Sequence, residues 1–298
     1  MFKRSAAVVV AILALALPSL SGAQPHRSQG GERPGIASPG GASETLFDLP
    51  LSGGGVQRIL YLAPSRLRGT IVMLPGGAGD VGLTRHGDIR HDDNFVVRTR
   101  DLWVARGYAV VIPDAADHEN LRGLRSSTGY AALVRDFVTY AHAQGRGPVF
   151  LLGTSQGSIA AMNGAAHMGR AQIAGVVLTE SVTEMGGSHE TVFDAEPDRV
   201  SVPALVVANR DDRCNVAPPR DAPKIAAALS HSVQVRVLNV SGGVRRSQKD
   251  CGSLTPHGYY GIEATVVAIS RIGWMLTPDL AVIWRVAKSR CRRFFCIR

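Results

Sequence analysis

One stretch decides how this chain folds: Gly153-Thr154-Ser155-Gln156-Gly157. It follows the apolar run 148–152 and precedes the small-residue run 158–166, which can form a helix. The pattern G-x-S-x-G between a buried strand and a helix is typical of a nucleophile elbow, a strained turn that exposes a serine hydroxyl. Side chains at the two glycine positions would collide with the flanking strand and helix. The pattern therefore predicts that Ser155 is a nucleophile.

Strand-like and helix-like segments alternate on both sides of this stretch. Short continuous apolar segments predict strands at 56–62, 70–74, 108–112, 148–152, 175–178, 203–207 and 233–240. Segments with helical character lie between and after them, at 94–106, 130–143, 158–166, 219–229 and 261–272. Buried strands that alternate with helices predict an α/β fold, a doubly wound and mostly parallel sheet flanked by helices.

A serine nucleophile needs a base, and the base needs a carboxylate that holds its tautomer. The segment 208–213, Ala-Asn-Arg-Asp-Asp-Arg, follows the predicted strand 203–207. It therefore places carboxylates at the carboxyl end of a sheet strand, where open α/β sheets build their sites. Asp212 is the preferred acid, with Asp211 as the alternative because a one-residue difference in the loop would exchange the two side chains. Glu180, which follows the preceding strand, is a further alternative.

The base is expected after the acid, since α/β-hydrolases carry their triad in the chain order Ser, Asp or Glu, His. Of the nine histidines, only His257 follows the last predicted strand and opens the last helix, in Thr255-Pro256-His257-Gly258. His257 is therefore the predicted base.

The negative oxygen of a tetrahedral intermediate needs preorganised backbone N–H donors. One expected donor is the amide of Gln156, directly after the nucleophile. The other is Gly77 or Ala78, in the glycine-rich loop 75–79 that follows the strand 70–74. The loop matches neither G-x-x-x-x-G-K-[ST] nor G-x-G-x-x-G, and zinc-ligand spacing is missing, so neither a cofactor nor a metal is predicted.

These residues together resemble the α/β-hydrolase fold superfamily over residues 45–273. More narrowly, the chain is similar to a group of exported bacterial α/β-hydrolases of poorly defined substrate, through the stretches 75–77, 94–98, 153–157, 210–214 and 257–259. The resemblance implies a Ser-Asp-His hydrolase, and a carboxylesterase acting on a small-molecule ester is the leading expectation. Alternatives are a catalytically silent binding protein, or a small peptidase or acyltransferase of the same fold. The insertion 181–200 is too short for a large lid domain.

The first 44 residues are predicted to lie outside the folded domain. Lys3 and Arg4 precede the apolar run 6–17, and the small residues 21–23 fit a cleavage site, so 1–23 is predicted to be a signal peptide. Residues 24–44 have a composition rich in Gly, Pro, Ser and Arg and are expected to form a flexible leader. The mature protein is thus predicted to be exported, either to the periplasm or outside the cell.

The net charge of +9 is concentrated at the ends of the chain. Residues 285–298 carry six basic residues and no acidic one, within a predicted C-terminal extension at 274–298. The body between the ends is nearly neutral, which argues against a nucleic-acid-binding surface. A solvated end is the expected state of this basic tail, and contact with anionic surfaces is the alternative.

Four cysteines are present in a chain that is predicted to be exported. Cys214 follows the acid loop and Cys251 precedes the base loop, so a disulfide between them is expected, and it would join the loops of Asp212 and His257. Closing this loop would stabilise the fold by about 4 kcal/mol in the chain-entropy model. Cys291 and Cys296 lie in the basic tail, and the alternatives for them are a pair with each other or a pair with another chain.

Overall fold

A computed structural model describes residues 36–37, 43–270 and 272. These residues form one sheet of nine strands in the order β1-β2-β3-β5-β4-β6-β7-β8-β9. The strands are β1 (Ile36–Ala37), β2 (Ser43–Pro50), β3 (Val56–Ala63), β4 (Gly69–Leu74), β5 (Tyr108–Pro113), β6 (Val149–Thr154), β7 (Gly175–Thr179), β8 (Ala204–Asn209) and β9 (Val235–Val240).

Most of the sheet is parallel. The neighbouring strands from β5 to β9 all pair in parallel, and the N-terminal strands β1 to β3 join the β5 edge as antiparallel strands. After β4 the chain builds β5 on one side and then returns to place β6 on the other side. The carboxyl ends of β4 and β6 therefore lie at a topological switch point, where open α/β sheets form their binding crevice.

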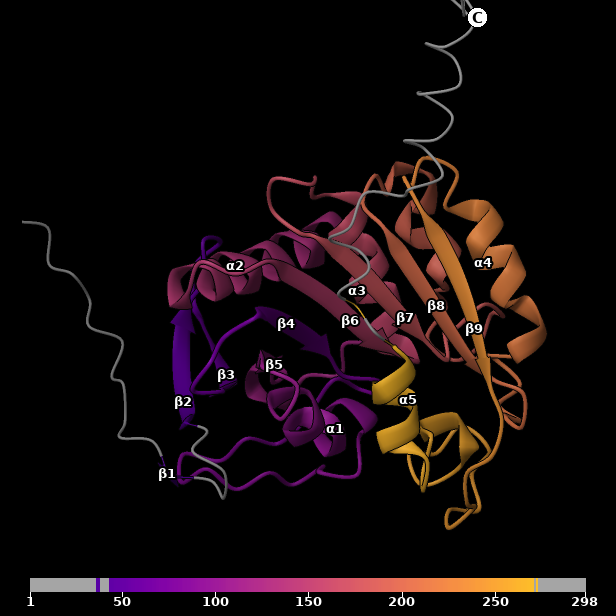
Figure 1. The fold of residues 1–298 in the computed structure, drawn as a ribbon, viewed down its shortest axis with the longest axis horizontal. Coiled ribbons are helices and arrows are strands. Elements are labelled where there is room, and N and C mark those ends of the chain that lie inside the picture. The colour runs from indigo at the N-terminus through magenta and orange to yellow at the C-terminus, as the bar shows by residue number, and fades with distance from the viewer. Residues whose placement is uncertain (1–35, 38–42, 271, 273–298) are drawn as a thin grey trace, which may run out of the picture.

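Helices cover both faces of the sheet (Figure 1). One face carries α2 (Thr128–Gln144), α3 (Gln156–Ala166) and α4 (Ala222–Ala228), and the other carries α1 (Phe95–Val104) and α5 (Glu263–Ile269). Two separate apolar cores result, one on each side of the sheet. The central strands are buried along their whole length, so they appear in the sequence as continuous apolar runs rather than as alternating ones. This is the predicted doubly wound α/β architecture.

Two predicted elements differ from the structure. The segment 219–229 was expected to be one helix, but it forms the short 3-10 helix η4 (Pro219–Asp221) followed by α4. Prolines lack a backbone N–H and restrict the residue before them, so Pro219 and Pro223 favour two short pieces. The helix predicted at 261–272 is α5 and ends at Ile269.

The sequence also missed the strand β2. It begins at Ser43, inside the segment expected to be a flexible leader, and it pairs with β3 over its full length. Its burial is mostly partial, so its sequence lacks the strong apolar run of the central strands. The turn that joins it to β3 contains Gly54 and Gly55, both with positive φ, and this glycine cluster is the local signal for the hairpin.

Several predictions concern residues outside those described. These are the signal peptide 1–23, most of the leader, the basic tail, and the cysteines Cys291 and Cys296. Across the described part of the chain, the helices are all too short or too polar to cross a membrane.

Candidate active site

Ser155 lies in a strained turn between β6 and α3. Its backbone has φ 52° and ψ −123°, a conformation that L-residues rarely adopt. A Cβ atom at Gly153 would lie 2.1 Å from the carbonyl oxygen of Gly157, and one at Gly157 would lie 2.1 Å from that of Leu74. Only glycine fits these two positions, as the sequence pattern predicted. The turn is therefore a nucleophile elbow in geometry as well as in sequence.

The structure brings Ser155, Asp212 and His257 together, although they are far apart in sequence. His257 Nδ1 lies 2.8 Å from Asp212 Oδ2, and His257 Nε2 lies 2.9 Å from Ser155 Oγ. Because the Asp212 carboxylate accepts a hydrogen bond, the imidazole proton belongs on Nδ1, which leaves the lone pair of Nε2 facing the serine hydroxyl. Both His257 and Asp212 are buried. This is the arrangement in which a histidine can remove the proton from a serine.

The loop after β8 holds Asp212 by short-range hydrogen bonds. The backbone N–H of Asp212 donates to the carbonyl oxygen of Asn209, and the backbone N–H of Cys214 donates to Asp212 Oδ1 at 2.8 Å. Asp211 points elsewhere: it is exposed, and its Oδ2 accepts a hydrogen bond from the backbone N–H of Gly242 at 2.6 Å. Of the two neighbouring acids, only Asp212 therefore faces His257.

The base loop is tied to the acid loop in two ways. The predicted disulfide between Cys214 and Cys251 is present and is confirmed. In addition, the side-chain amide of Asn209 donates to the carbonyl oxygens of Gly242 and Pro256, at 2.9 and 3.0 Å. His257 itself lies in the 3-10 helix η5 (Pro256–Gly258). One covalent link and one buried amide thus limit the separation of the two loops.

Arg98 of α1 also binds the base loop. Its Nη2 donates to the carbonyl oxygen of Gly258 at 2.7 Å, and its Nε forms an ion pair with Glu263 at 3.0 Å. The sequence stretch 94–98 was among those that resembled exported hydrolases, but no role had been assigned to it. The structure shows that its arginine binds the residue next to His257.

The glycine-rich loop after β4 approaches the elbow closely. A Cβ atom at Gly76 would lie 2.9 Å from the carbonyl oxygen of Thr154 and 3.2 Å from Ser155 Cβ. Gly77 has a φ of 62°, and Gln156 is the first residue of α3, whose N-terminal N–H groups have no partner within the helix. The expected oxyanion donors Gln156, Gly77 and Ala78 therefore lie on the two segments that meet at Ser155.

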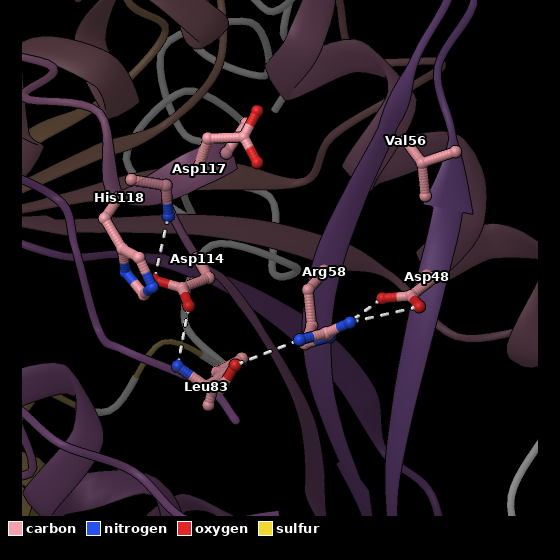
Figure 2. Close-up of a pocket in the computed structure, with 9 residues that line it drawn as sticks. Asp48, Val56, Arg58, Leu83, Asp114, Asp117 and His118 are labelled. Carbon is pink, nitrogen blue, oxygen red and sulfur yellow. Dashed lines mark hydrogen bonds and ion pairs between the residues drawn. The ribbon is translucent and has the colours of Figure 1, made fainter. Parts of the chain in front are cut away.

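Two buried side chains that the sequence analysis missed bind the backbone of this loop and of the segment that follows it. Asp114 follows β5, and its carboxylate accepts hydrogen bonds from four backbone N–H groups, those of Val81, Gly82, Leu83 and Ala115, at 2.6–3.0 Å. Figure 2 shows Asp114 pointing to the backbone of Leu83, beside the cavity of about 330 Å³ that it helps to line. The buried Arg125 reaches the carbonyl oxygen of Pro75 at 3.4 Å, and burial lowers the pKa of its guanidinium. Asp114 stands at the carboxyl end of a strand, the same signal that selected Asp212.

The cavity in Figure 2 is not lined by Ser155, Asp212 or His257. Arg58 in its wall forms an ion pair with Asp48 at 2.8 Å and donates to the carbonyl oxygen of Leu83. His118, also in the wall, binds Asp80 through Nδ1 at 3.0 Å. These polar side chains are engaged with one another or with backbone, so the cavity presents no nucleophile paired with a base.

The insertion 181–200 is short and forms no large lid domain, as predicted. It contains two 3-10 helices, η2 (Val192–Ala195) and η3 (Pro197–Arg199), both in contact with α3. Near the elbow, the side-chain amide of Gln156 donates to Ser188 Oγ at 3.0 Å. The insertion therefore forms one wall beside the nucleophile and does not build a separate lid domain.

No protein-family model matches this chain, and no curated protein matches its sequence. Solved structures nevertheless share its fold. A dienelactone hydrolase from Anabaena variabilis superposes with a TM-score of 0.55 at 16% identity, over 79% of this chain and 97% of that one. A thermostable esterase superposes with a TM-score of 0.53 at 14% identity, over 78% of this chain and 62% of that one. An esterase from Pyrococcus furiosus superposes with a TM-score of 0.50 at 10% identity, over 67% of this chain and 83% of that one. The chain therefore has the α/β-hydrolase fold, as its motifs predicted.

Proposed function

We propose that this protein is a serine hydrolase that cleaves carboxylic esters through Ser155, Asp212 and His257. The observation that carries the proposal is the continuous hydrogen-bonded chain from Asp212 through His257 to a serine in a strained elbow. Folds of this type also serve other functions, so the argument rests on these side chains rather than on the architecture. The hydrolases and esterases among the structures of the same fold agree with it.

The geometry supports a two-step reaction. His257 Nε2 takes the proton of Ser155 Oγ as that oxygen attacks the ester carbonyl carbon, and the backbone N–H groups of Gln156 and of Gly77 or Ala78 stabilise the resulting oxyanion. The intermediate collapses as His257 returns the proton to the departing alcohol, which leaves an acyl group on Ser155. Water, activated in turn by His257, then releases the carboxylic acid and restores the serine. Asp212 stabilises the imidazolium that forms in each step.

The proposed location is outside the cytoplasm. A structural disulfide persists in oxidising compartments and is rare in the cytosol, so the Cys214–Cys251 bridge agrees with an exported protein. The predicted signal peptide points in the same direction. Liberation of the mature chain into the periplasm or medium, with a new N-terminus near residue 24, would test this part of the proposal by mass spectrometry.

Ser155→Ala tests the proposed activity. A set of p-nitrophenyl esters of graded acyl length and a fluorophosphonate probe would be applied to the wild type and to the variant. We expect wild-type hydrolysis and labelling, and a loss of roughly 10⁴-fold or more in kcat for the variant, with no labelling at residue 155. A catalytically silent binding protein of this fold would show neither hydrolysis nor labelling in the wild type, and that result would overturn the proposal.

A further inference from the structure

Glu180 is a second buried acid beside the triad, and the reaction described above does not use it. It follows β7 directly, with a φ of 42°, and its side chain is buried. Glu180, Asp212 and His257 each place one side-chain oxygen or nitrogen atom within 4.8 Å of the other two. Positive φ is uncommon for a residue with a long side chain and has an energetic cost. The backbone at Glu180 therefore takes a strained conformation in a chain segment that directs a carboxyl group at the triad acid.

The hydrogen bonds around Glu180 leave one of its oxygens without a donor. Oε1 accepts from the backbone N–H of Asn209 at 2.8 Å. Within the described part of the chain, Oε2 has no donor at all. The hydroxyl of Tyr259 donates to the carbonyl oxygen of Val207 at 3.0 Å and also borders the Glu180 carboxyl group. Burial and the charge of Asp212 raise the pKa of that acid more than its hydrogen-bonding contact with Tyr259 lowers it. A buried carboxyl oxygen with no donor is unfavourable in a carboxylate and favourable in a protonated acid, whose O–H can donate to the neighbouring Asp212 carboxylate.

Three titratable side chains lie against Glu180. They are Asp212 from the loop after β8, and His257 and Tyr259 from η5 and the residue after it. Two carboxylates this close in a buried site cannot both ionise without a large repulsion. Burial, and then the charge of Asp212, raise the pKa of Glu180 well above its usual range. Asp212 is the acid that receives a hydrogen bond from His257, so Glu180 is the one that keeps its proton.

A metal ion is a poor explanation for these three side chains. His257 uses both ring nitrogens, one for Asp212 and one for Ser155. Asp212 uses Oδ2 for His257 and Oδ1 for the backbone N–H of Cys214. A cation would have to break the hydrogen-bonded triad to gain its ligands, whereas a proton on Glu180 preserves every one of these bonds.

We propose that Glu180 is a positioning residue: a neutral carboxylic acid that donates a hydrogen bond to Asp212 and so holds the Asp212 carboxylate toward His257. This proposal rests on the proposed function. A neutral donor also spreads part of the negative charge of Asp212, so removal of the donor would strengthen the charge that Asp212 presents to His257. Glu180 acts through Asp212 and needs no contact with substrate.

Two substitutions separate this role from a structural one. Glu180→Gln keeps a neutral N–H donor for Asp212 and an oxygen that can accept from the backbone N–H of Asn209. Glu180→Met has a side chain of similar length but supplies neither the donor nor the acceptor. We expect Glu180→Gln to keep kcat within a few-fold, and Glu180→Met to lose roughly 10- to 100-fold in kcat with little change in KM, the range expected for loss of a hydrogen bond to a charged group. The acid limb of the kcat/KM profile should stay in place for Glu180→Gln and move up by as much as about one pH unit for Glu180→Met.

Two kinetic outcomes for Glu180→Gln and Glu180→Met would overturn the proposal. Equal losses in both variants would show that the ionised form is required, and wild-type kinetics in both would show that Glu180 does not act on the triad. If Glu180→Met does not fold, a shifted acid limb in Glu180→Gln alone overturns the proposal. The resonance of the His257 Nδ1 proton, measured by NMR, should be unchanged in Glu180→Gln and displaced in Glu180→Met. This readout needs no turnover, so it tests the positioning role even if the wild type hydrolyses no ester.

Discussion

Two buried acids at the carboxyl ends of strands in this sheet have opposite surroundings. Asp114, after β5, accepts hydrogen bonds from four backbone N–H groups. Glu180, after β7, accepts one and faces a second carboxyl group. Both are almost completely inaccessible, at 4% and 1% exposure, so burial alone does not distinguish them. The number of N–H donors distinguishes them. An acid surrounded by N–H groups is stabilised as an ion and anchors the backbone, whereas an acid beside a second carboxylate is stabilised by keeping its proton.

The two regions also divide the work of the proposed reaction. On the Asp114 side, the chain presents backbone N–H groups in a glycine-rich loop, Arg125 binds that loop, and Asp114 binds the segment that follows it. On the Glu180 side, titratable side chains move a proton in the proposed reaction. The loops that bear these side chains are restricted by a disulfide and by the side-chain amide of Asn209. Backbone donors need only a correct position, whereas a proton relay also needs the correct charge on each member.

The largest expected effect distinguishes the acids on the proton-transfer side. Asp212→Asn should lower kcat by about 10⁴-fold, because an amide favours the wrong tautomer of His257. Asp211→Asn is the matched control and should stay within a few-fold of the wild type, since Asp211 binds the backbone of Gly242. Steady-state kinetics on a p-nitrophenyl ester measures both. A larger loss for Asp211→Asn would mean that Asp211, and not Asp212, serves His257.

A smaller effect, on stability, is expected on the anchoring side. Asp114→Ala leaves the buried N–H groups of Val81, Gly82 and Leu83 without an acceptor, at about 1–3 kcal/mol each. The free energy of unfolding should therefore fall by several kcal/mol. Asp114→Asn should cost less, because it keeps one oxygen.

Urea unfolding measures these losses, with Asp48→Ala as an exposed control. Asp48 pairs with Arg58 at the surface, and its removal should cost no more than about 1 kcal/mol. An Asp114→Ala variant as stable as the control would contradict the anchoring role.

The smallest expected effect is the pH dependence of stability on the proton-transfer side. The folded-state pKa of Glu180 lies well above its value of 4.5 in an unfolded chain, mainly through burial. Between these two pKa values the folded state binds more protons, so stability is lost as pH rises, by up to about 1.4 kcal/mol per pH unit. Glu180→Gln removes this loss. The difference in unfolding free energy between variant and wild type should therefore move in favour of the variant from pH 5 to pH 8, and a constant difference would contradict a neutral Glu180.

Much of this architecture follows from local sequence patterns. The central strands are continuous apolar runs because both faces of the sheet are covered. The elbow glycines are required by close backbone contacts, within the strand-turn-helix unit for Gly153 and with the neighbouring strand β4 for Gly157. The order of Ser155, Asp212 and His257 along the chain then selected the candidate triad. β2 was missed because its burial is partial, and η4 because its prolines interrupt what seemed a single helix.

The sequence by itself determined the fold class, the position of the elbow serine and the pair of cysteines, because each depends on residues that are close together or on simple order along the chain. Only the tertiary structure decided between Asp211 and Asp212, and only it placed Glu180, Asp114 and Arg98. Those roles depend on which side chains face one another after distant strands pair. The protonation of a buried acid such as Glu180 depends on neighbours contributed by two other segments of the chain, and no local pattern records their approach.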